Sequence, residues 1–94
     1  MQTVNKATVE GPLQTIAQVY RLQFAGGKLA CFVEANTNVL SHYASGRMIC
    51  RLPIAKLGKE RRRPLCQGTL DRHVARLGVD VVREALRNAP TINP

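Results

Sequence analysis

The sequence is poor in aromatic and acidic residues, and each shortage excludes a class of function. Four of the 94 residues are aromatic and none is tryptophan, so a broad platform for stacking bases is hard to build. Only six are Asp or Glu, with no paired-carboxylate motif and no acidic metal-binding motif of the nuclease kind. No run approaches the roughly 18 apolar residues that a membrane helix needs. The sequence therefore predicts no membrane span and no nuclease-like active site.

Cysteine is scarce and irregularly spaced. Cys31, Cys50 and Cys66 are odd in number and include no CxxC pair, unlike a disulfide framework or a typical zinc site. We expect reduced thiols. The N-terminal residues include Lys6 and Glu10 but no apolar segment of a secretory signal. These observations predict a cytoplasmic protein without metal or cofactor.

The length of the chain limits what the interior can hold. A chain of 94 residues is expected to form one domain over 1–94, and a domain of this size has little interior to spare for a roomy cofactor cavity. The Gly-Gly-Lys sequence at 26–28 lacks the glycine spacing and the following Ser or Thr of a phosphate-binding loop. We therefore expect a protein that is not an enzyme.

Hydrophobic alternation predicts an antiparallel sheet of two β-hairpins. Apolar residues alternate over 15–24 and again over 29–35, with a Gly-Gly pair between them. A second pair of alternating segments, 39–43 and 47–52, flanks a turn that also contains glycine. Each segment is expected to bury one face.

Two further expectations concern the ends of this sheet. Strict alternation in the last strand puts Arg47 and Arg51 on one side, opposite Met48 and Cys50. Residues 1–10 are expected to be either flexible or an edge strand. Open edge strands in a sheet of this size also predict a homodimer as one possible assembly.

After residue 64 the hydrophobic period becomes helical. Thr69 is expected to cap a helix over 69–77, and Asp80 a second helix over 80–88. The expected buried stripe of the second helix comprises Val81, Val82, Ala85 and Leu86. The predicted fold class is α+β: a small antiparallel sheet with two short C-terminal helices packed on one face.

The segments between and after these elements are expected to be irregular. Residues 59–64 are predicted to form an exposed connector, since Gly58 and Pro64 bound them. Pro90 is expected to stop the second helix. Residues 91–94 would then form a frayed tail.

Positive charge is concentrated in the middle of the chain. Residues 39–63 contain seven Lys or Arg and one Glu, a net charge of +6, whereas 1–38 and 64–94 each carry +1 of the total +8. The candidate binding residues are Arg47, Arg51, Lys56, Lys59, Arg61, Arg62 and Arg63. One guanidinium group can bind two phosphate oxygens at once, and each phosphate that it neutralises releases condensed counterions. The pattern predicts non-catalytic binding of a nucleic-acid backbone, DNA or RNA.

Other interpretations of these residues stay open. The basic segment is also typical of a solvated loop, or of an inhibitor or adaptor that docks on an acidic protein surface or adds an edge strand to a partner. Phe32 and Tyr43 form either a small platform for bases or part of the core. The two helices either pack on the sheet or form a helix-turn-helix that presents Arg83, Arg87 and Asn88 to bases.

In size, charge and order of elements the chain resembles small accessory proteins of phages, plasmids and other mobile elements. Some proteins of this type bind nucleic acid, and others inhibit or adapt a host protein. The resemblance is one of general type and implies no role for any single residue.

Overall fold

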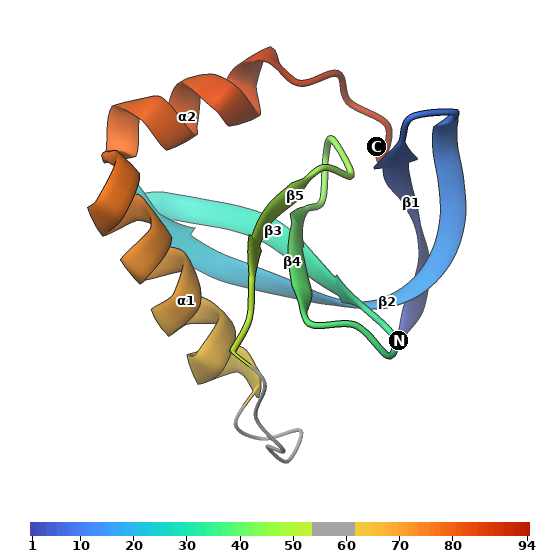
Figure 1. Cartoon of the computed structure of the whole chain (residues 1–94), viewed down its shortest axis with the longest axis horizontal. Coiled ribbons are helices and arrows are strands. Elements are labelled where there is room, and N and C mark those ends of the chain that lie inside the picture. The colour runs from blue at the N-terminus through green and yellow to red at the C-terminus, as the bar shows by residue number, and fades with distance from the viewer. Residues whose placement is uncertain (54–61) are drawn as a thin grey trace.

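The structure, a computed structural model, describes residues 1–53 and 62–94 and has the predicted α+β class (Figure 1). Five strands pair antiparallel, each with the next along the chain, in the order β1-β2-β3-β4-β5. The elements are β1 (Gln2–Thr8), β2 (Gly11–Phe24), β3 (Gly27–Glu34), β4 (Val39–His42), β5 (Met48–Arg51), α1 (Arg62–Leu77) and α2 (Val79–Asn88). The N-terminal residues form the edge strand β1, one of the two predicted states. No helix among the described residues is long and apolar enough to cross a membrane.

The first predicted hairpin is confirmed as β2 and β3. Their paired residues run from Ala17 with Glu34 to Phe24 with Gly27, which leaves a two-residue turn. Both turn residues have positive φ, 52° at Ala25 and 80° at Gly26. This is the geometry of a turn whose twist matches that of the flanking strands.

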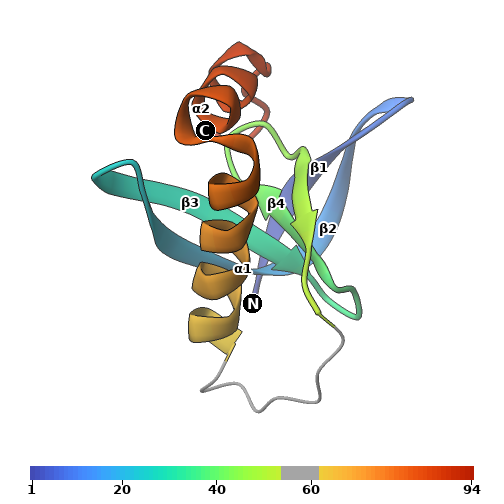
Figure 2. The same ribbon diagram turned by 60° about the vertical axis from the view of Figure 1, so that its left-hand side comes forward.

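The sheet buries apolar side chains on both of its faces. On the face covered by α1, the core contains Tyr20, Leu22, Cys31, Val33, Leu40, Cys66 and Leu70. Figure 2 shows α1 crossing this face. On the other face Phe32, 1% exposed, packs with Val4 and Ala17, and Val19 and Tyr43 lie against them. Phe32 therefore belongs to the core, and the platform for bases suggested by its parity is wrong.

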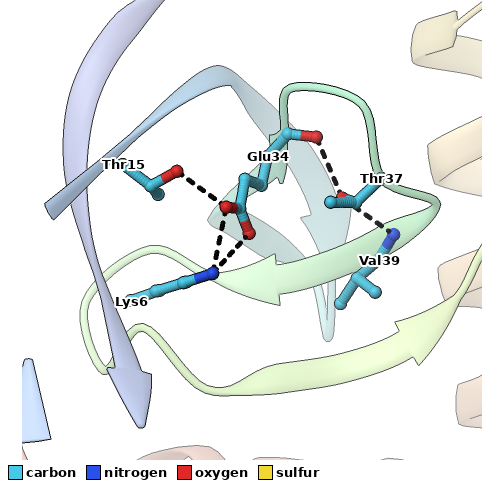
Figure 3. Close-up of polar contacts among 5 residues, drawn as sticks. All are labelled: Lys6, Thr15, Glu34, Thr37 and Val39. Carbon is cyan, nitrogen blue, oxygen red and sulfur yellow. Dashed lines mark hydrogen bonds and ion pairs between the residues drawn. The ribbon is translucent and has the colours of Figure 1, made fainter. Parts of the chain in front are cut away.

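An ion pair ties three strands together at this second face. The Nζ of Lys6 on β1 donates to both carboxylate oxygens of Glu34 on β3, at 3.0 Å each, and Thr15 Oγ1 on β2 donates at 2.8 Å (Figure 3). Burial alone would raise the pKa of Glu34, but the hydrogen bonds from Lys6 and Thr15 outweigh it and lower that pKa. Thr37 Oγ1 donates to the Glu34 carbonyl at 2.9 Å and so holds the loop that follows.

The last strand contains an irregularity that the sequence pattern does not reveal. Leu40 pairs with Cys50 and Ser41 with Met48, so Ile49 is an extra residue on β5. Ile49 packs against the same core as Cys50, whereas Met48 is 58% exposed. A bulge of this kind breaks the alternation. The prediction that Arg47 and Arg51 project from one side therefore loses its basis.

Helix α1 extends further toward the N-terminus than predicted. It includes residues 62–64, so the connector proposed for 59–64 is wrong there. Pro64 is tolerated because the first turn of a helix needs no N–H donor. Thr69 lies inside the helix instead of capping it, where it is 8% exposed and its Oγ1 donates to the Leu65 carbonyl at 2.8 Å.

Helix α2 buries less of its surface than its stripe predicts. Val82 is buried and Leu86 half-buried, but Val81 is 58% exposed and Ala85 is exposed as well. Gly78 is the residue at the N-cap, and no side chain caps the helix. The predicted cap Asp80 instead accepts from Arg83 at 3.3 Å on the surface.

The C-terminal residues are packed, which corrects the prediction of a frayed tail. The N–H groups of Ile92 and Asn93 donate to the Ala44 carbonyl at 2.7 and 3.1 Å. Asn93 is 4% exposed and bonds to both backbone groups of Asn5. Figure 1 shows the tail ending beside β1. Helix α2 ends before Pro90 as predicted, but the backbone of Ala44 and of Asn5 provides hydrogen-bond partners for the tail.

Candidate nucleic-acid interface

An open groove of about 570 Å³ runs between β5 and α1. Its polar lining comes from Arg51 on β5 and from Thr69, Arg72, His73 and Arg76 on α1. Positions 69, 72, 73 and 76 recur at the spacing that puts helical residues on one face. The groove therefore gathers three guanidinium groups from two elements.

Hydrogen bonds orient the two arginines of α1. Arg72 donates to Thr69 Oγ1 at 3.3 Å, and the hydroxyl of Thr69 is held by its own bond to the helix backbone. Arg76 lies 3.4 Å from His73 Nδ1. Burial lowers the pKa of His73, and the charge of Arg76 lowers it further, so the ring is neutral at pH 7 and its free nitrogen can accept from Arg76.

Within residues 1–53 and 62–94, no carboxylate lines the groove. The nearest acidic residue along α1, Asp71, accepts from Gln67 at 2.9 Å, and Gln67 also bonds to the backbone of Gln23 on β2. Asp71 thus belongs to the opposite flank of the helix. As far as the described residues go, the groove is a cluster of positive charge with no carboxylate in its lining, which is the electrostatic requirement for binding an anion.

A second, smaller hollow continues this surface toward the first turn of α1. It has a volume of about 40 Å³, is lined by Arg62, and shares Leu52 and Pro53 with the larger groove. In the part of the chain that the structure describes, its lining likewise contains no acidic side chain. We call Arg51, Arg62, Arg72 and Arg76 the β5–α1 seam. From Arg62 to Arg76 the helix rises about 21 Å, which is about six base-pair steps of B-DNA.

Two of the predicted binding residues, Arg51 and Arg62, lie in the seam. Arg63 lies on the other flank of α1, where its guanidinium carbon is 5.7 Å from the centre of the Tyr20 ring and its Nη1 donates to the Arg21 carbonyl at 3.0 Å. Arg47 is exposed in the turn before β5 and does not line the groove. Lys56, Lys59 and Arg61 lie outside the described residues.

Sequence reasoning missed Arg72 and Arg76. They lie in a segment with a net charge of only +1, so the distribution of charge along the chain did not distinguish them. Their spacing of four residues within a predicted helix was the available signal. Knowing that this flank of the helix faces β5 requires the fold.

No family model, curated protein or solved structure matches this chain.

The thiols of this protein are protonated in the folded state. Burial raises the pKa of Cys31 to about 12 and that of Cys66 to about 11. Burial also raises the pKa of Cys50, which lines the groove, while Arg76 and Arg72 oppose that shift. All three cysteines are free, and a protonated thiol is a poor nucleophile.

A buried histidine and serine hold the turn before β5. His42 Nδ1 lies 2.8 Å from Ser45 Oγ, and Ser45 Oγ also accepts from the Arg47 N–H at 3.3 Å. The serine is 2% exposed, which closes its hydroxyl to a substrate. Among residues 1–53 and 62–94, no cluster of three His, Cys, Asp or Glu side chains could hold a metal ion.

Proposed function

We propose that this protein binds the phosphate backbone of a nucleic acid, without catalysis, along the β5–α1 seam. The observation that carries the proposal is the groove that Arg51, Arg72 and Arg76 line together, with no carboxylate in its lining among the residues that the structure describes. A planar guanidinium group can donate two parallel hydrogen bonds to two oxygens of one phosphodiester. The sequence also predicts Lys56, Lys59 and Arg61 as binding residues. They follow Arg51 along the chain and would add further phosphate contacts.

Binding of this kind depends steeply on salt, because each neutralised phosphate releases condensed counterions. The slope of log affinity against log salt is about −0.9 per phosphate for duplex DNA and about −0.7 for a single strand. Four seam arginines that each contact one phosphate therefore predict a slope of about −3 to −4. Contacts from the segment before α1 would make the slope steeper.

The test compares two double variants that remove the same charge. In Arg72→Ala/Arg76→Ala the groove loses two guanidinium groups. In Arg83→Ala/Arg87→Ala, α2 loses two arginines at the same spacing outside the seam. The affinity for fluorescent oligonucleotides is measured from 50 to 300 mM salt. The first variant should bind them about tenfold or more weakly than the wild type, and its slope of log affinity against log salt should be shallower by about 1.4 to 1.8. Equal weakening in both variants, or no binding to the wild type at low salt, would refute the proposal.

The alternative function is docking on an acidic partner protein. The version in which an edge strand adds to a partner sheet is disfavoured at β1, because Asn5 and Ala7 already bond to Asn93 and Gly46. Co-purification from the native cells, with and without nuclease, distinguishes docking of a protein on the seam from binding of nucleic acid. A protein partner retained after nuclease treatment would favour an adaptor, and its retention by an Arg61→Ala/Arg62→Ala/Arg63→Ala variant would place the docking surface outside these basic residues.

We place this function in the cytoplasm, where nucleic acid is available and thiols stay reduced. Three free cysteines, two of them buried in the core, fit a reducing compartment. A small accessory protein of a mobile element is the biological type that the proposal suits.

A further inference from the structure

The basic groove continues into an apolar hollow beneath α2. Ile49 and His73 line both, and the hollow, of about 140 Å³, is otherwise formed by apolar side chains of β5, α1 and α2. Three of these side chains are among the most exposed apolar groups of the protein: Met48 at 58%, Leu77 at 44% and Val81 at 58%. Apolar side chains exposed together, beside a charged site, mark a binding surface more often than isolated ones do.

Charge changes sharply along this surface. Arg51, Arg72 and Arg76 line the groove but not the hollow. Beyond Val81, the surface of α2 carries Asp80, which pairs with Arg83, and Glu84. Among the described residues, the far end therefore lacks the excess of positive charge found in the groove. The ligand that fits has an anion at one end and an uncharged, largely apolar group at the other.

We propose that the ligand is a single-stranded nucleic acid, whose phosphates bind the seam arginines while one unstacked base covers Met48, Leu77 and Val81. This inference rests on the proposed function and specifies its substrate class. In a duplex the faces of the bases are stacked inside, so only phosphates, sugars and base edges reach the protein. A single strand can turn a base out onto an apolar surface. The hollow is smaller than the roughly 300–1,000 Å³ of pockets for drug-sized ligands, which suits one base.

The first experiment compares three oligonucleotides with the wild-type protein at fixed salt: a single strand, a duplex with the same number of phosphates, and a single strand with abasic sites. The single strand is expected to bind at least tenfold tighter than the other two. A duplex or abasic strand that binds as tightly as the single strand overturns the inference. The proposed function then still stands if Arg72→Ala/Arg76→Ala weakens all binding, and it fails if nothing binds in a salt-dependent way.

A pair of matched variants locates the base. Leu77→Ser/Val81→Ser removes exposed apolar surface at the hollow, and Leu13→Ser/Ile16→Ser removes a similar amount from β2, where the side chains are 54% and 56% exposed. The first variant should lose the preference for a single strand while its salt slope is unchanged. The second should behave as wild type. Equal behaviour of the two variants overturns the inference.

Cys50 supplies a readout that needs no variant. It lies in the groove and is partly accessible, whereas Cys31 and Cys66 are buried. Alkylation of Cys50 by N-ethylmaleimide should be slowed by saturating single strand and much less by duplex at equal phosphate concentration. An acidic, leucine-containing peptide that protects Cys50 better than the single strand would overturn the inference in favour of a protein partner.

Discussion

Replacing Asn93 by alanine is expected to cost a large part of the stability of this protein. The Asn93 side chain makes three hydrogen bonds: its oxygen accepts from the Asn5 N–H at 2.9 Å, and its nitrogen donates to the carbonyls of Asn5 and Tyr43 at 2.7 Å each. Each such bond contributes about 0.5–1.5 kcal/mol, and more where a buried partner is left unpaired. We therefore expect a loss of about 2–4 kcal/mol in the free energy of unfolding.

Urea denaturation followed by far-ultraviolet circular dichroism measures this loss. The midpoint should fall with little change in the slope, because the same surface is exposed on unfolding. For a domain of this size the loss corresponds to roughly 10–30 °C in Tm. Asn88→Ala is the matched control, since Asn88 is exposed and bonds only to Glu84 on its own helix.

A second substitution tests whether the donors of the side chain matter. Asn93→Asp keeps the acceptor for the Asn5 N–H but turns a carboxylate oxygen toward two carbonyls. It should be at least as destabilising at pH 7 as Asn93→Ala. If Asn93→Ala unfolds within about 0.5 kcal/mol of the wild type, or if Asn93→Asp is the more stable of the two variants, the tail does not hold the sheet edge.

Three further predictions concern stability. Gly46→Ala should cost several kcal/mol in the urea assay, because φ is +67° and an added Cβ would lie 2.8 Å from the backbone N of Ala7 and the backbone O of Asn5; a midpoint like that of wild type would contradict this. Burial lowers the pKa of His42, so the unfolded chain binds that proton more readily and the free energy of unfolding should fall as pH drops below about 6.5; a His42→Asn variant with an equally steep pH dependence would exclude this residue as the cause. Arg63→Ala should lose about 0.5–1 kcal/mol from its contact with Tyr20, yet keep the wild-type salt slope for oligonucleotides, and a shallower slope would place Arg63 in the binding surface.

The parts of the fold that local pattern determines could be predicted from the sequence. The β2–β3 hairpin follows from alternation on either side of a Gly-Gly pair, and the apolar period predicts α2 and the part of α1 from residue 69 onward. The bulge at Ile49 could not be predicted, because one extra residue leaves no trace in a short apolar strand. The packed tail also escaped prediction, since the side-chain partners of Asn93, Asn5 and Tyr43, lie 88 and 50 residues away in sequence.

Of the arginines that line the candidate site, the sequence named only those whose charge stood out along the chain. Arg51 and Arg62 were named because the segment around them is strongly basic. Arg72 and Arg76 were not, since nearby acidic residues cancel their charge in any count along the sequence. In space Asp71 faces the other flank of α1, so the cancellation is lost once the helix packs against β5.

The charges of the seam also support the proposal that it binds an anion from outside the protein. Among the described residues, the two ion pairs of the protein are Lys6 with Glu34 and Arg83 with Asp80, and neither pair lines the groove. Arg51, Arg72 and Arg76 line that groove together, so their like charges repel, and no carboxylate within the described part of the chain relieves the repulsion. On the proposal, a phosphodiester in the groove would relieve that repulsion and accept paired hydrogen bonds from the guanidinium groups.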